Sequence, residues 1–154
     1  KFNTLTGPNN TGIMGSSLGG LISLWAGFEY PDIFGRVGSI SPSLWWDSNM
    51  MEKEYLPKKN RLDHKVWLDM GTQEGLNRQG KSLALQDTRQ VCELLKSKGY
   101  KQGKDLYYFE HIGAYHDEAS WASRIHMPLL FLFGKDGIKV SLETGDSVEP
   151  NRAA

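Results

Sequence analysis

The fold of this chain is decided near its start, by the stretch Gly12-Ile13-Met14-Gly15-Ser16-Ser17-Leu18-Gly19-Gly20. Apolar residues predict a short strand over 12–15, and apolar residues at helical spacing from Leu18 onward predict a helix. Between them lies the pattern G-x-S-x-G, centred on Ser17. A serine on such a sharp turn exposes its hydroxyl, and the backbone N–H of the next residue, Leu18, can donate to an oxyanion. A glycine-rich turn without catalytic importance would use the same residues, so the rest of the chain has to supply the partners.

The remaining elements alternate between strands and helices. Strands are predicted over 36–40, 65–70 and 106–112, and helices over 78–98 and 118–133, the last with a kink at Pro128. Such alternation indicates an α/β fold with a parallel sheet and right-handed crossovers. We expect about four parallel strands in the order of the sequence with flanking helices, and the strand before Ser17 at one edge.

Composition restricts the partners. The chain has 154 residues, of which 39% are hydrophobic, enough for one domain with a core. Its 18 basic and 18 acidic residues balance, so no net field favours nucleic acid or an anionic membrane surface. No apolar run reaches the roughly 20 residues of a membrane span. The single cysteine, Cys92, is expected to be a buried helix residue. We therefore expect a small-molecule partner, no cofactor and no metal.

A nucleophilic serine needs a histidine to accept its proton. Of four histidines, His64 precedes the third predicted strand, His111 lies within the fourth and His126 lies in a helix. His116 follows the fourth strand on a loop, where the base of such a site is expected. His116 is thus the predicted base.

An acid that orients this histidine should follow the third strand, where two candidates occur. Asp69 lies within the strand and Glu74 in the loop beyond it. The loop position gives a side chain freedom to reach the imidazole, so Glu74 is preferred and Asp69 remains the alternative. Asp117 and Glu118 are expected to cap the last helix.

With a serine, an acid and a histidine in this order, the chain resembles an esterase group of the α/β-hydrolase superfamily. This group contains S-formylglutathione hydrolase, feruloyl and acetyl-xylan esterases, and siderophore trilactone esterases. The resemblance spans about 12–133 and implies a serine carboxylic-ester hydrolase with an acyl-enzyme intermediate. Relatives place the acid in a Gly-Thr-x-Asp/Glu segment, which supports Glu74. Besides the first stretch, it rests on Phe34-Gly35-Arg36-Val37-Gly38-Ser39-Ile40-Ser41-Pro42-Ser43-Leu44-Trp45-Trp46, on Asp69-Met70-Gly71-Thr72-Gln73-Glu74, and on His116-Asp117-Glu118 with Trp121.

The resemblance also marks a departure, because relatives have further strands before the nucleophile strand and a loop that gives the second oxyanion donor. We therefore expect 1–134 to form the C-terminal half of an α/β-hydrolase domain, truncated at its N-terminus. Residues 135–154 are expected to be a linker or the start of a following module. Weak activity and self-association through the exposed edge of the nucleophile strand are the expected consequences.

Three other interpretations compete with a hydrolase. A catalytically silent binding domain would use Trp45, Trp46 and Tyr115 as an aromatic pocket, which in the esterase would hold the substrate. A metal site would need His111, His116 and Asp117, whose spacing matches no strong ligand pattern. An acyltransferase would use the same triad with another acceptor, and no residue decides between the two.

Overall fold

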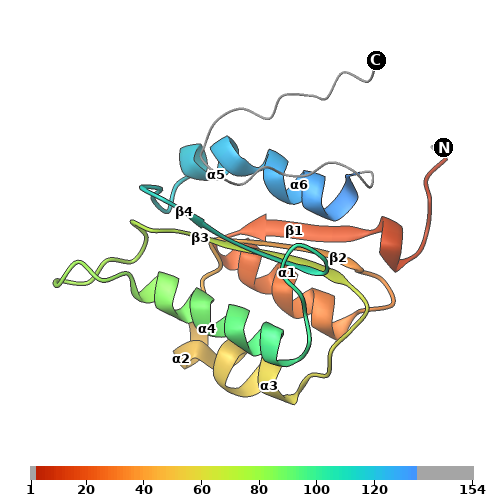
Figure 1. Cartoon of the computed structure of the whole chain (residues 1–154), viewed down its shortest axis with the longest axis horizontal. Coiled ribbons are helices and arrows are strands. Elements are labelled where there is room, and N and C mark those ends of the chain that lie inside the picture. The colour runs from red at the N-terminus through yellow and green to blue at the C-terminus, as the bar shows by residue number, and fades with distance from the viewer. Residues whose placement is uncertain (1–2, 135–154) are drawn as a thin grey trace.

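The computed structural model describes residues 3–134, which are built around one parallel sheet. Its strands are β1 (Gly12–Ser16), β2 (Arg36–Ile40), β3 (Lys65–Gly71) and β4 (Leu106–His111). They lie side by side in the order β1-β2-β3-β4, and every neighbouring pair is parallel (Figure 1). The predicted four-stranded α/β architecture is therefore confirmed, with β1 at one edge of the sheet formed by the described residues.

Helices cover both faces of this sheet. Helix α1 (Leu18–Glu29) packs on β1 and β2, and α4 (Leu83–Ser97) packs on β3 from the same side (Figure 1). Because every connection moves one strand along in the same direction, crossovers of one hand place these helices on one face. The chain then crosses to the other face, where α5 (Glu118–Arg124) is followed by α6 (His126–Phe133), which contacts β2 and β3.

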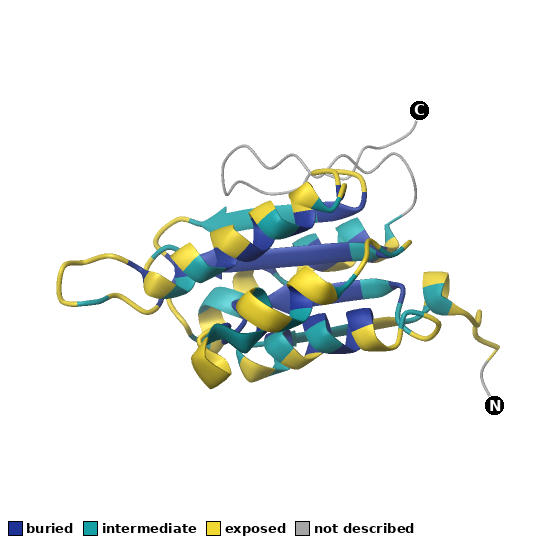
Figure 2. Ribbon diagram, turned by 90° about the horizontal axis from the view of Figure 1, so that it is seen from below, coloured by how far each residue is buried: buried dark blue, intermediate teal, exposed yellow. Residues whose placement is uncertain are grey.

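Alternating residues of β3 face two separate cores. Val66 and Leu68 belong to the larger core, beneath α1 and α4, whereas Trp67 belongs to the smaller core beneath α6. All three side chains are fully buried, and the two central strands, β2 and β3, are buried along almost their whole length (Figure 2). Parallel sheets are typically covered on both faces. Here the two cores hold β3 from both sides, and β3 leads directly into the loop that contains Glu74.

Two predicted helix boundaries were wrong. The helix predicted over 78–98 begins only at Leu83, because Ser82 caps it by accepting a hydrogen bond from the Leu85 N–H at 2.9 Å. The preceding residues form a turn in which the Asn77 side chain accepts from the backbone of Gln79 and Lys81. The Ser82 cap therefore sets the start of α4, and the polar residues before it belong to the turn.

The helix predicted over 118–133 is two helices, broken at Ile125 and not at Pro128. Proline lacks an N–H and its ring collides with the carbonyl four residues earlier, here that of Arg124. The disturbance therefore shows one turn before the proline, and Pro128 itself lies within the first turn of α6, where it is tolerated.

Helical segments that were not predicted precede β1 and β3. A 3₁₀ turn, η1, covers Pro8–Asn10, and α2 (Trp46–Met50), the π-helical η2 (Met51–Tyr55) and α3 (Leu56–Lys58) follow one another. Met51 and Leu56 complete the larger core. No helix of residues 3–134 has the length and apolar character of a membrane span. The predicted linker at 135–154 lies outside the described residues.

Candidate active site

Ser17 sits on a strained turn between β1 and α1. Its φ of 58° and ψ of −123° lie outside the ordinary regions for a residue with a side chain, and such strain is typical of functional positions. The Ser17 N–H donates to the Ile40 carbonyl at 3.0 Å, which ties the turn to β2. A Cβ atom on Gly20 would lie 2.7 Å from that same carbonyl oxygen. The glycine therefore lets α1 approach β2 closely enough to hold the serine in place.

His116 reaches Ser17 from the loop after β4. Its Nε2 atom lies 2.9 Å from Ser17 Oγ, and its Nδ1 atom lies 2.6 Å from Glu74 Oε2. An ionised carboxylate can only accept, so Nδ1 carries the proton of a neutral ring and Nε2 is free to accept from the Ser17 hydroxyl. Trp121 packs edge-on against the imidazole, with ring centroids 5.0 Å apart. The three predicted residues Ser17, Glu74 and His116 thus form one hydrogen-bonded chain.

Glu74 is held as a fixed, buried acceptor. Only 1% of the residue is exposed, and its Oε1 atom accepts from the Gly71 N–H at 2.7 Å and from the Ser41 hydroxyl at 2.6 Å. Its second oxygen, Oε2, is the atom that faces His116. A carboxylate bonded at both oxygens has little freedom to rotate, so it also fixes the orientation of the imidazole.

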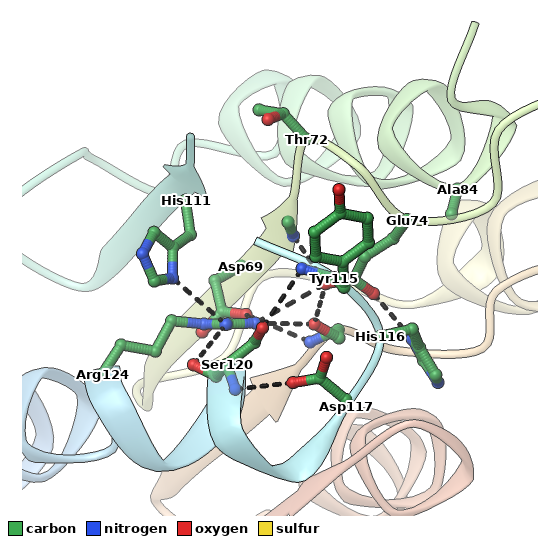
Figure 3. A network of polar contacts seen from close by, with 12 residues as sticks. Asp69, Thr72, Glu74, Ala84, His111, Tyr115, His116, Asp117, Ser120 and Arg124 are labelled. Atoms are coloured by element: carbon green, nitrogen blue, oxygen red, sulfur yellow. Dashed lines mark hydrogen bonds and ion pairs between the residues drawn. The ribbon is translucent and has the colours of Figure 1, made fainter. Parts of the chain in front are cut away.

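Asp69, the alternative acid, is placed elsewhere by the structure (Figure 3). Its Oδ1 atom accepts from Arg124 Nη2 at 2.9 Å and from the Ser41 N–H at 3.1 Å, and its Oδ2 atom accepts from Trp67 Nε1 at 2.6 Å. Asp69 is fully buried. These bonds commit its carboxylate to the base of the site, below the group that contacts His116.

Arg124 lies beside both buried carboxylates. Its side chain is 2% exposed, and Nη2 lies 2.9 Å from Asp69 Oδ1 and 3.7 Å from Glu74 Oε1. It also donates to Ser41 Oγ at 2.7 Å, and Ser41 in turn donates to Glu74. The guanidinium thus donates directly to Asp69, lies within ion-pair distance of Glu74, and is also linked to Glu74 through the Ser41 hydroxyl.

The predicted oxyanion donor lies at the turn, and the three predicted pocket residues lie on the surface. Leu18 is the first residue of α1, and the first N–H groups of a helix have no partner within it, so its N–H is available at the turn. Trp45, Trp46 and Tyr115 are each more than half exposed, and the two tryptophan rings lie 6.0 Å apart. They are therefore surface residues and not part of either core; their role in binding a substrate stays a prediction.

The residues of the alternative metal site have separate partners. His111 Nδ1 lies 3.3 Å from Arg124 Nη1, and burial, together with this cation, lowers the pKa of His111. Asp117 caps α5 by accepting from the Ser120 N–H at 2.7 Å, a bond that lowers its pKa. Across residues 3–134 no three acidic, histidine or cysteine side chains gather in a way that could hold a metal ion.

Sequence reasoning missed Ser41, Ser43 and Arg124. The two serines follow β2 and flank Pro42, at the strand end where a site of this fold is expected, and that position could have drawn attention to them. Arg124 gave no such signal, because an arginine in a helical pattern is usually exposed.

The α/β-hydrolase class is defined by a mostly parallel sheet, a serine on a strand-to-helix turn, and an acid and a histidine after later strands. The described residues have this arrangement. The family model described as "Putative esterase" matches residues 1–132, and the chain belongs to this family.

The chain is also similar to individual proteins, one of which is named as an esterase. The chain is 33% identical over 137 residues to "Uncharacterized protein YbbA" of Bacillus subtilis, covering 88% of this chain and 54% of that protein. A stretch of 39 residues is 49% identical to the iron(III) enterobactin esterase of Dickeya dadantii, covering 25% of this chain and 9% of that protein.

Solved structures share the fold. The enterobactin esterase of Shigella flexneri, crystallised with 2,3-dihydroxy-N-benzoyl-glycine, aligns with a TM-score of 0.66 at 23% identity, over 81% of this chain and 32% of its own. A ferulic acid esterase of Anaeromyces mucronatus aligns with a TM-score of 0.60 at 23% identity, over 84% of this chain and 47% of its own. The chain thus spans about half or less of each of these relatives.

Proposed function

We propose that this chain carries the catalytic residues of a serine carboxylic-ester hydrolase, with Ser17 as nucleophile, His116 as base and Glu74 as the orienting acid. One observation supports this most strongly, the continuous chain of hydrogen bonds from Glu74 Oε2 through both ring nitrogens of His116 to Ser17 Oγ. Membership of an esterase family and the likeness to esterase structures support the same reaction class.

The proposed reaction has two halves. In the first, Ser17 Oγ bonds to the carbonyl carbon of an ester while its proton passes to His116 Nε2, and the carbonyl oxygen takes up the electron pair. The Leu18 N–H donates to this oxyanion. When the carbonyl re-forms, the alcohol leaves with the proton from His116, and an acyl-serine remains.

In the second half, water replaces the alcohol. His116 removes a proton from water, the resulting hydroxide bonds to the acyl carbon, and the Ser17–acyl bond breaks as Oγ takes the proton back. Glu74 stays ionised throughout and stabilises the imidazolium that forms in each half. The hydrogen bonds from Gly71 and Ser41 suit Glu74 to this task, because they hold its carboxylate in a fixed orientation toward His116.

The substrate is proposed to be an ester of a small organic acid, held by exposed aromatic residues in the two segments that contain Ser43 and His116. Two similar structures were solved in the presence of 2,3-dihydroxy-N-benzoyl-glycine and in complex with ferulic acid, and both compounds contain an aromatic ring. Trp45, Trp46 and Tyr115 offer aromatic surface for such a group.

The proposal is tested with p-nitrophenyl acetate hydrolysis and with labelling by a fluorophosphonate, which reacts rapidly only with an activated serine. Ser17→Ala and His116→Ala should lower the rate by several orders of magnitude without loss of the fold, which circular dichroism would check. Glu74→Gln should cost about 10³- to 10⁴-fold. Asp69→Asn is the matched control, and its loss should be the smaller one because its carboxylate does not contact His116.

Two outcomes would contradict the proposal. Undiminished ester turnover by Ser17→Ala would show that another group attacks the ester. Absence of labelling at Ser17 in the folded wild-type chain would favour the silent binding domain instead.

A further inference from the structure

A second serine hydroxyl lies against the candidate nucleophile. Ser43 Oγ is 3.1 Å from Ser17 Oγ, although the two residues are 26 positions apart in the sequence. Ser43 is 98% buried, and its N–H donates to the Ser17 carbonyl at 3.1 Å. The loop after β2 is therefore fixed to the turn by its backbone, and this contact holds the Ser43 hydroxyl beside Ser17.

The direction of the hydrogen bond between the two serines follows from counting protons. Glu74 accepts from His116 Nδ1, so Nε2 of the neutral ring carries no proton and accepts from Ser17. Ser17 has a single hydroxyl proton, which this bond uses. The proton between the two serines must then come from Ser43, so that Ser17 Oγ accepts from Ser43 while it donates to His116.

We propose that Ser43 is a further catalytic residue, whose hydroxyl supports Ser17 Oγ during attack on the ester. This inference rests on the proposed function. An alcohol oxygen has one proton and two lone pairs. With the proton directed at His116 and one lone pair bound by Ser43, the remaining lone pair has a fixed direction for attack.

The contribution of Ser43 should be largest while Ser17 Oγ is losing its proton. As Nε2 takes this proton and the bond from Oγ to the carbonyl carbon forms, Oγ carries partial negative charge, and a donated hydrogen bond strengthens with that charge. In the acyl-enzyme Oγ is an ester oxygen, a weaker acceptor, while water attacks. Ser43 should therefore accelerate acylation more than the water-attack step of deacylation.

The test is Ser43→Ala in the full chain, assayed with p-nitrophenyl acetate and a fluorophosphonate. For an activated ester kcat/KM reports acylation, and kcat reports deacylation when the acyl-enzyme accumulates. We expect kcat/KM and the rate of phosphonylation at Ser17 to fall together by about 10- to 100-fold, the effect of one hydrogen bond to a charged group. We expect a smaller fall in kcat, below about threefold, because Oγ is an ester oxygen, and so a weaker acceptor, while water attacks the acyl-enzyme.

Ser39→Ala is the matched control. Ser39 is also fully buried and its hydroxyl makes one hydrogen bond, to the Gly20 carbonyl at 2.9 Å, at the back of the same turn. Both variants lose one buried hydroxyl, so urea unfolding should show similar losses of stability, while Ser39→Ala should keep wild-type kcat/KM. Unchanged kcat/KM in Ser43→Ala, or an equal fall in both variants, would overturn the role of Ser43.

The same assays separate this inference from the proposed function. If Ser17→Ala abolishes turnover and labelling while Ser43→Ala matches the wild type, only the role of Ser43 fails. If the wild-type chain is neither labelled at Ser17 nor active, both fail.

Discussion

Arg124, Asp69 and Glu74 form a buried group of charges. Arg124→Met is therefore the substitution whose effect on the free energy of unfolding is most informative. Methionine fills a similar volume but removes the only guanidinium that contacts both Asp69 and Glu74 in residues 3–134. These carboxylates are 0% and 1% exposed, so water cannot replace the lost partner. Breaking a buried ion pair by removing one partner typically costs about 3–5 kcal/mol. That is a large share of the 5–15 kcal/mol of a typical domain.

The measurement is urea unfolding followed by fluorescence of the five tryptophans. Arg89→Met is the control, because Arg89 also bonds a carboxylate, Glu110, through two hydrogen bonds of 2.7 Å, but its side chain is 54% exposed. This exposed pair should contribute less than about 1 kcal/mol. Adding Asp69→Asn to Arg124→Met should restore at least about 1 kcal/mol, since it removes one stranded charge. Equal losses in the two arginine variants would refute the importance of burial here.

Two further predictions concern His64 and the turn at Ser17. Burial lowers the pKa of His64, which bonds the Tyr100 hydroxyl at 2.7 Å, to about 4, whereas an unfolded chain titrates near 6.5. The stability from neutral His64 is therefore complete above about pH 6.5 and falls by about 3 kcal/mol as pH drops to 4. Urea unfolding at two pH values should show this loss in the wild type and not in His64→Gln; parallel curves would contradict it. Gly20→Ala should cost about 1–3 kcal/mol, because its Cβ would lie 2.7 Å from the Ile40 carbonyl oxygen. Gly19→Ala meets nothing within 4 Å and should leave the thermal midpoint no lower than that of the wild type.

Strands were predicted well from the sequence because their signal is local. A run of apolar residues bounded by glycine or polar residues gave β2 at its observed bounds, and gave β1, β3 and β4 within one residue at their ends. The order of the sheet followed from the regular alternation with helices. Helix ends were predicted less well, since the start of α4 depends on a cap at Ser82 and on a turn around Asn77 that periodicity does not detect.

The sequence predicted the three residues of the candidate site, Ser17, Glu74 and His116. It did not predict the residues that hold them in place, such as Ser41 and Arg124. Parallel strands bring their carboxyl ends to one edge, so residues after β1, β3 and β4 could be expected to meet there. Which carboxylate faces His116 is a matter of side-chain direction. Glu74 and Asp69 lie five positions apart. The Gly71 N–H and the Ser41 hydroxyl bond Glu74, whereas Trp67, Arg124 and the Ser41 N–H bond Asp69, and these different partners separate the roles of the two carboxylates. Such bonds depend on tertiary packing, which cannot be predicted from the spacing of residues in the sequence.

Glu74 and His116, which share a hydrogen bond, differ in exposure to solvent, and this difference suits the proposed reaction. Glu74 is 1% exposed at its side chain, whereas His116 is 41% exposed. A buried acid pays its cost of desolvation once, in folding, where Arg124 and the hydrogen bonds from Gly71 and Ser41 compensate it. The base must meet ester, alcohol and water in turn, and an exposed edge lets each of them approach Nε2. Hydrolysis by this route needs a fixed acid beneath an accessible histidine, and the order of burial from Glu74 to His116 provides both.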